Sequence, residues 1–127
     1  GPGMPEWGFL PIPKKILATG VRDMVRLSDA RMSGTAFGTV VVHITPESAG
    51  GGPLAAIQDG DMIEIDVPNR KLNLMITDDQ LKERLNTDSS SGPEFKRGYK
   101  WLHAQHILQA DKGCDFGFLR AESLQND

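Results

Sequence analysis

The sequence contains a single cysteine, few aromatic residues and no long apolar run. One thiol, Cys114, excludes an internal disulfide and also a metal cluster built from cysteines of this chain alone. Apolar runs such as Val40 to Val42 are far too short to cross a bilayer. We therefore expect no membrane partner and a reducing compartment, the cytoplasm or, in a eukaryote, an organellar matrix.

The chain also has no strong excess of either positive or negative charge. The chain has 14 basic and 17 acidic residues, a net charge of −3, and no run of five or more like charges. A nucleic-acid-binding domain needs a clustered basic face, so we expect no nucleic-acid partner. The sequence also lacks the Gly-Lys-Ser/Thr of a phosphate loop, a GxGxxG that opens a helix and the GxSxG of a hydrolase elbow.

The length of 127 residues suits one domain, and the 14 glycines and 8 prolines indicate many turns around short elements. Terminal signals and apolar spacing predict helices over residues 13–19, 54–57, 77–85 and 99–110. Alternating or β-branched stretches predict strands in the second half of 21–28, as a buried strand over 39–44, and over 62–67 and 72–76. The interleaving of these elements predicts an α/β or mixed barrel-like domain.

Local signals are clearest in the second half of the chain. The strands over 62–67 and 72–76 are joined by a tight Pro68-Asn69-Arg70 connection, which predicts a hairpin. Thr77 and Gln80 match a capping box at the start of the following helix. We expect an extended segment over 1–12 and a flexible linker over 87–97, because both are rich in turn-forming residues.

The strongest candidate site is the small-residue loop from Arg31 to Thr39. Its glycines would let a ligand approach the backbone, and Ser33 and Thr35 supply two hydroxyl groups two residues apart. On composition alone a glycine-rich turn is the commoner interpretation of such a loop.

Two charged features of the sequence have ordinary interpretations. Glu6 lies in a glycine- and proline-rich segment, where a lone carboxylate is usually solvated. Asp29 and Arg31 would form an anion clamp or, as the commoner interpretation, a structural ion pair with each other.

Histidine and cysteine give weak signals. His43 lies in an apolar stretch and is expected to be a hydrogen-bonded core residue. His103 and His106 are three residues apart on a predicted helix and hence neighbours, but two histidines make an incomplete metal site. Cys114 is expected to be a packed or idle thiol.

Six segments, in order, resemble the C-terminal domain of the dihydroxyacid and phosphogluconate dehydratase family. They cover nearly the whole chain: Pro2–Glu6, Ser28–Thr35, His43–Glu47, Gly51–Leu54, Asp59–Asp61 and Ile65–Arg70. The sequence from Ser28 to Ala36 and from Gln109 to Phe116 is more similar to the sugar-acid (aldonate) branch than to the branched-chain amino-acid enzyme.

The resemblance implies a swivelling β/β/α domain, a barrel-like mixed sheet with flanking helices that spans residues 1–127. Such enzymes dehydrate a 2,3-dihydroxy acid to a 2-keto acid. They use an iron–sulfur cluster and a magnesium ion held between this domain and a larger N-terminal partner domain. In the family the cluster iron acts on the departing C3 hydroxyl, and magnesium holds the carboxylate and the C2 oxygen.

The resemblance also assigns roles to individual residues. Ser33 would be the alkoxide base at C2, and Ser33, Gly34 and Thr35 would bind an aldonate substrate. Glu6 would ligate magnesium, with the remaining ligands supplied by the N-terminal domain. A serine becomes basic only where positive charge and backbone donors stabilise its anion, and magnesium prefers oxygen ligands.

Whole enzymes of this family run to several hundred residues and pair as dimers or tetramers. Because no cluster cysteines are present, this chain is expected to be an excised or separately encoded domain that binds no cofactor and has no activity alone. Three alternatives stay open: a branched dihydroxy acid as substrate, a phosphorylated gluconate as substrate, and a stand-alone module that binds small anions or a partner.

Overall fold

The computed structural model describes residues 2–34, 37–87 and 95–119. Within these residues the strands are β1 (Glu6–Gly8), β2 (Arg26–Leu27), β3 (Arg31–Met32), β4 (Val40–Val41), β5 (Ile63–Asp66) and β6 (Lys71–Leu74). The α-helices are α1 (Lys14–Ala18), α2 (Asp78–Thr87) and α3 (Gly98–His106). Single 3₁₀ turns are η1 (Ser48–Gly50), η2 (Pro53–Ala56), η3 (Ala110–Lys112) and η4 (Gly117–Leu119). The predicted mixed α/β character is confirmed.

The strands form three two-stranded sheets. β1 pairs with β3 and β2 pairs with β4, both in parallel, whereas β5 and β6 form an antiparallel hairpin. These sheets do not join into a closed barrel within the described residues, so the swivelling-barrel architecture stays a prediction.

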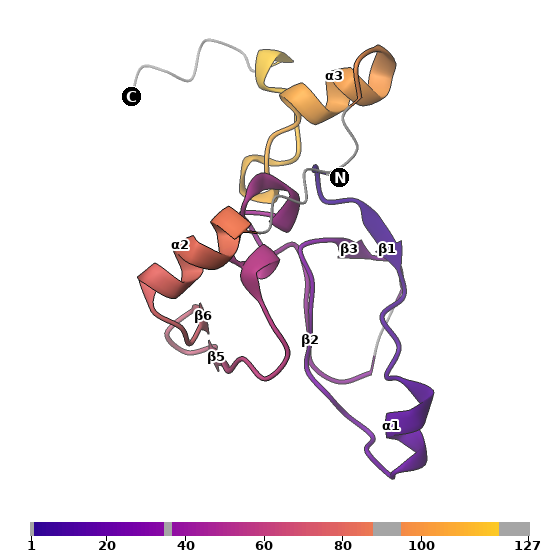
Figure 1. Ribbon diagram of the computed structural model, residues 1–127. Coiled ribbons are helices and arrows are strands. Elements are labelled where there is room, and N and C mark those ends of the chain that lie inside the picture. The colour runs from indigo at the N-terminus through magenta and orange to yellow at the C-terminus, as the bar shows by residue number, and fades with distance from the viewer. Residues whose placement is uncertain (1, 35–36, 88–94, 120–127) are drawn as a thin grey trace.

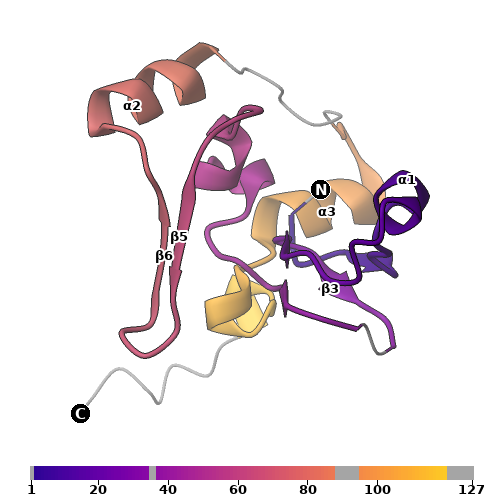
Figure 2. The same cartoon turned by 90° about the horizontal axis from the view of Figure 1, so that it is seen from below.

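Figures 1 and 2 show how these parts are arranged. In Figure 1, α1 and α3 lie at opposite ends of the molecule, with β1 and β3 between them. In both views α2 lies at one end of the β5–β6 hairpin. The hairpin extends away from the part that contains β1, β3 and α1 (Figure 2).

The hairpin and the helix after it follow the sequence prediction closely. Four residues of β5 face four of β6 in register, from Ile63 opposite Leu74 to Asp66 opposite Lys71. The capping box is also confirmed: the Gln80 N–H donates to Thr77 Oγ1 at 3.2 Å, and the Thr77 N–H donates to Gln80 Oε1 at 3.0 Å.

Two predicted elements are shorter in the structure. The strand predicted over 39–44 is reduced to β4 and is half-buried, because His43 has a φ of +60° that ends the extended backbone. The helix predicted over 99–110 ends at His106, because Ile107 turns extended (ψ 130°) and forms a bridge with Phe116.

The other helices match better. α1 begins after Pro13 and is followed by Gly20 at a φ of +88°, as its start and stop signals predicted. The predicted 54–57 helix is the 3₁₀ turn η2. β1 lies inside the segment predicted to be extended, and the predicted linker over 87–97 falls mostly outside the described residues.

Few side chains are fully buried in the described residues. Three are apolar, Ile12, Ala30 and Ala56, and the fourth is the carboxylate of Glu47, which is 1% exposed. A buried carboxylate is costly unless hydrogen bonds compensate it, so Glu47 stands out as a structural centre of the domain.

Candidate functional site

Ser33 lies immediately after β3, where the structure fixes its backbone. The Ser33 N–H donates to the carbonyl of Gly8 at 2.7 Å, so the start of the loop is tied to the end of β1. The Ser33 side chain is exposed. Gly34 follows with a φ of +82°, a conformation that favours glycine, and turns the chain away from β1. Thr35 lies outside the described residues.

Glu6 lies on β1 next to this loop. β1 and β3 are parallel with Glu6 opposite Arg31, and Ser33 is two residues beyond Arg31. The pairing is irregular between Glu6 and Gly8, and Ser33 follows the end of β3. The structure thus places the segments that carry Glu6 and Ser33 side by side, although these residues are 27 positions apart in the sequence.

The predicted ion pair between Asp29 and Arg31 is wrong. Arg31 instead pairs with Glu6, with 3.5 Å between Nη2 and Oε2, and both side chains are about half exposed. Asp29 accepts hydrogen bonds from the Ser48 N–H at 2.7 Å and from the Ser48 hydroxyl. Asp29 lies in a bend before β3, and both residues find their partners in other segments of the chain.

The far end of the loop is held by Arg26, a residue that sequence reasoning missed. Its guanidinium donates to the carbonyl of Leu10 at 2.6 Å and to the carbonyl of Phe37. Gly38 is required nearby, because a Cβ there would lie 1.9 Å from Asp23 Oδ1. Arg26 thus ties the loop to the segment that follows β1.

Glu47 is the second residue that sequence reasoning missed. Its carboxylate accepts hydrogen bonds from the backbone N–H groups of Gly3, at 2.8 Å, and Met4. It also accepts from Gln109 Nε2 at 2.9 Å. Its position directly after Pro46 suggested a strand end rather than a buried acid. The only signal in the sequence was that Glu47 ends the segment His43–Glu47, one of the six that carry the family resemblance, and the resemblance assigned it no role.

The histidines form no metal site within the described residues. His43 is exposed, and the prediction of a core histidine is wrong because the positive φ turns it out of the strand. His103 and His106 are neighbours on α3, where they contact Phe116 and Phe118 respectively, both edge to face. No group of three or more His, Cys, Asp or Glu side chains gathers in residues 2–34, 37–87 and 95–119.

Cys114 is a half-buried thiol. Burial raises its pKa above the ordinary 9.0, and the negative charge of Glu47 raises the pKa further. A raised pKa keeps the free thiol protonated near neutral pH.

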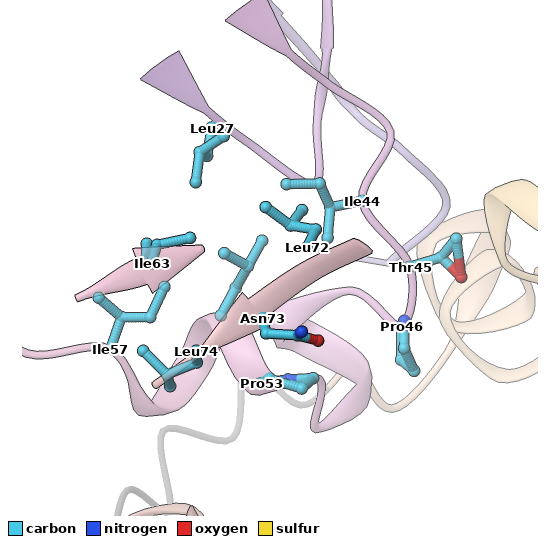
Figure 3. A pocket seen from close by; sticks show the side chains of 11 residues that line it. Leu27, Ile44, Thr45, Pro46, Pro53, Ile57, Ile63, Leu72, Asn73 and Leu74 are labelled. Carbon is cyan, nitrogen blue, oxygen red and sulfur yellow. The ribbon is translucent and has the colours of Figure 1, made fainter. Parts of the chain in front are cut away.

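An apolar hollow in the described residues is lined by residues other than Ser33. Figure 3 shows this pocket of about 190 Å³, where the β5–β6 hairpin faces Leu27, Ile44 and the η2 turn. Its lining is nearly all aliphatic, with Asn73 and Thr45 as polar exceptions (Figure 3). None of the residues that line it is titratable.

No helix in the described residues is both long and apolar enough to cross a membrane.

The known proteins that this chain is similar to include three that are each named as a dehydratase. An L-arabinonate dehydratase of Rhizobium leguminosarum bv. trifolii (strain WSM2304) is 54% identical over 119 residues, 94% of this chain. A 6-deoxy-6-sulfo-D-gluconate dehydratase of Pseudomonas putida is 50% identical over 120 residues, also 94% of this chain. A dihydroxy-acid dehydratase of Sulfolobus acidocaldarius (strain ATCC 33909 / DSM 639 / JCM 8929 / NBRC 15157 / NCIMB 11770) is 38% identical over 114 residues, 90% of this chain.

The chain spans about a fifth of the length of these curated relatives, 21% of the first two and 20% of the third. The protein-family model described as dihydroxy-acid/6-phosphogluconate dehydratase C-terminal matches residues 1–114, which is most of the chain. Both of the residues that the structure brings together, Glu6 and Ser33, lie in the matched part. The chain therefore belongs to the dihydroxy-acid/6-phosphogluconate dehydratase family, as its C-terminal domain.

Proposed function

We propose that this chain is the C-terminal domain of a dehydratase that converts a 2,3-dihydroxy sugar acid to a 2-keto-3-deoxy acid, with Ser33 as the base. One observation carries the proposal: Ser33 is fixed to β1 next to Glu6 by its 2.7 Å bond to Gly8. This serine lies in a chain that is 50–54% identical to relatives named as sugar-acid dehydratases. Relatives named as dihydroxy-acid dehydratases are 35–38% identical.

The proposed step is a proton transfer to Ser33 Oγ. The alkoxide takes the proton from C2 of the substrate, and the electrons of that C–H bond form a C2=C3 double bond. The C3 hydroxyl leaves as hydroxide with the electrons of its C–O bond and takes the proton from the Ser33 hydroxyl, which gives water and restores the alkoxide. The resulting enol tautomerises to the 2-keto acid. The exposed side chain and the following glycine give Ser33 the access that this step requires.

The donor set at Glu6 fits a share of a magnesium site. Its carboxylate is about half exposed, and its partner Arg31 is itself exposed, so a hard oxygen ligand is available to a cation. Bound magnesium would hold the carboxylate and C2 oxygen of the substrate and supply positive charge that favours the serine anion. Glu6 would be this domain's ligand, and the N-terminal domain would complete the set.

The described residues do not fit an iron–sulfur cluster. Cys114 is the only cysteine of the chain, whereas such a cluster needs several protein ligands. We assign the cluster to the N-terminal partner domain and derive no step of this chain through it.

The same proposal covers architecture and assembly. The three small sheets would act as parts of one swivelling β/β/α domain that closes on the N-terminal domain. Exposed large apolar residues on β1 and in the site loop, among them Trp7 at 71% and Phe37 at 74%, are consistent with a covered face in the whole enzyme. Thr35 would contact the substrate, and the whole enzyme would form a dimer or tetramer.

The test is an assay of the full-length protein against pentonates, hexonates, a sulfonated gluconate, a phosphogluconate and a branched dihydroxy acid. We expect formation of 2-keto-3-deoxy acid from one or more of the non-phosphorylated sugar acids. Turnover of the branched acid alone, or of the phosphorylated acid alone, would assign the substrate to one of the other branches. No turnover of any of them by a cluster-loaded protein would refute the proposed function.

A further inference from the structure

The buried carboxylate of Glu47 holds the N-terminal segment that carries Glu6. Its Oε2 accepts from the Gly3 N–H at 2.8 Å, and its Oε1 accepts from the N–H of Met4. At 1% exposure this carboxylate has lost its water, so these donors stabilise its charge. Glu47 and Gly3 are 44 positions apart, so the contact joins two distant parts of the chain.

The backbone of the segment is shaped to receive an anion. Gly3 has a φ of +92° and Met4 a φ of +53°, and the two successive N–H groups converge on the same carboxylate. Successive N–H groups turned in this way form an anion-binding concavity. Gly3 also cannot carry a side chain without displacement, because a Cβ there would lie 2.7 Å from Ile107 Cγ1 and 2.9 Å from His103 Cε1.

Glu47 is itself held from the other side. Its N–H donates to Gln109 Oε1 at 2.7 Å, while Gln109 Nε2 donates to its carboxylate at 2.9 Å. Its carbonyl accepts from the N–H groups of Gly50 and Gly52, each at 2.9 Å. The carboxylate is therefore a fixed point against which a more exposed segment is placed.

The path from this fixed point to Glu6 is two residues long. Met4 is bound to Glu47, Pro5 has a restricted φ, and the Pro5 carbonyl accepts from the Arg31 N–H at 3.0 Å. Glu6 follows directly, in register with Arg31. A shift of Gly3 and Met4 would move Glu6 relative to Ser33, although no hydrogen bond in the described residues links Glu47 to Glu6 or to Ser33.

We propose that Glu47 is a positioning residue for magnesium binding, which acts by fixing the segment that presents the Glu6 carboxylate. This inference rests on the proposed function, in which Glu6 is a magnesium ligand. Outer residues that orient metal ligands typically affect metal affinity by about 10–100-fold. Because Glu47 acts through the backbone, we expect the lower end of this range.

The experiment uses the full-length protein and titrates MgCl₂ in the absence of substrate. The readout is the rise in melting temperature with magnesium concentration, since a ligand that binds only the folded state stabilises it by mass action. Glu47→Gln should shift the titration midpoint about 10-fold to higher magnesium. Glu64→Gln is the matched control, because Glu64 is an exposed carboxylate on β5 that also accepts one side-chain hydrogen bond.

Gly3→Ala provides a second variant in case Glu47→Gln does not fold. It displaces the segment by the collision with Ile107 and His103 while leaving the buried carboxylate intact. Its control is Gly60→Ala, where φ is +94° but a Cβ would meet nothing within 4 Å. We expect Gly3→Ala to weaken magnesium binding and Gly60→Ala to leave the midpoint unchanged.

The outcomes separate the two proposals. A wild-type protein that responds to magnesium, with Gly3→Ala and any folded Glu47→Gln unchanged in midpoint, would overturn the positioning role and leave the proposed function standing. A wild-type protein that turns over a sugar acid but shows no magnesium response would overturn the metal assignment of Glu6, and the positioning role with it. In turnover assays, the expected signature is a loss in the variants that excess magnesium restores.

Discussion

The β5–β6 hairpin with α2 and the β1–β3 pair with Ser33 are held by different kinds of contact. The hairpin has four paired residues on each strand and is followed by a capped helix, all between residues 63 and 87. β1 and β3 have three and two residues, and most of what holds them comes from Arg26, Asp29 and Glu47 elsewhere in the chain. Regular local structure thus supports the domain, and dispersed side-chain bonds shape the site.

The largest difference between the two regions is expected from Ser33→Ala in the full-length enzyme, which should affect turnover and not folding. The exposed hydroxyl makes no described packing contact, so we expect unchanged folding and a loss of turnover of about 10³-fold. The measurement is kcat with the best sugar acid, beside the melting temperature. Thr87→Ala, an exposed hydroxyl at the end of α2, serves as the control and should keep full turnover. Full turnover in Ser33→Ala would refute the proposed base.

The next largest effect is expected from Arg26→Ala. Removal of the guanidinium leaves the carbonyls of Leu10 and Phe37 without their donor and should lower the free energy of unfolding by about 2 kcal/mol. Urea unfolding monitored by tryptophan fluorescence measures this loss. Arg22→Ala, an exposed arginine four residues earlier, is the control. An unchanged urea midpoint would show that Arg26 does not hold the site loop.

A loss of about 1 kcal/mol is expected from Thr77→Ala, which removes the capping hydroxyl of α2. The urea midpoint should fall, while magnesium affinity and turnover stay as in the wild type. A parallel fall in turnover would contradict the separation between the hairpin region and the site.

The smallest effect concerns acid stability of the hairpin turn. Hydrogen bonds from the Asn69 side chain and backbone hold the pKa of Asp66 below its ordinary 3.8. A depressed pKa adds stability above pH 3.8, and this contribution disappears as the pH falls through the lowered value. Asn69→Ala should therefore be less stable than the wild type near neutral pH, with the difference fading in acid below pH 3.8. Unfolding free energies measured from pH 6 to pH 2 test this sign.

The sequence predicts the hairpin region well because its signals are local. The alternation over 62–67 and 72–76, the turn between them and the box at Thr77 each act within a few residues. The sequence also marked Ser33 and Glu6 through the family resemblance. It did not place them together, because that needs the parallel pairing of Glu6 with Arg31 across 25 positions.

The errors have the same physical origin. Helical spacing continued past His106 toward Ala110, but the pairing of Ile107 with Phe116 ended the helix. Asp29 and Arg31 were expected to pair as neighbours, yet Ser48 and Glu6 bind them instead. The burial of Glu47 depends on Gly3, Met4 and Gln109 together, which no local pattern reports.

The bond between Glu47 and Gln109 has a consequence for the order in which the chain acquires its shape. Glu47 and Gln109 are 62 positions apart, so the contacts that hold Glu47 cannot all form until residue 109 has left the ribosome. The β5–β6 hairpin needs no such delay, since closing a short turn takes microseconds. During synthesis the β5–β6 hairpin would therefore form first, and the segment held by Glu47 would be the last to settle.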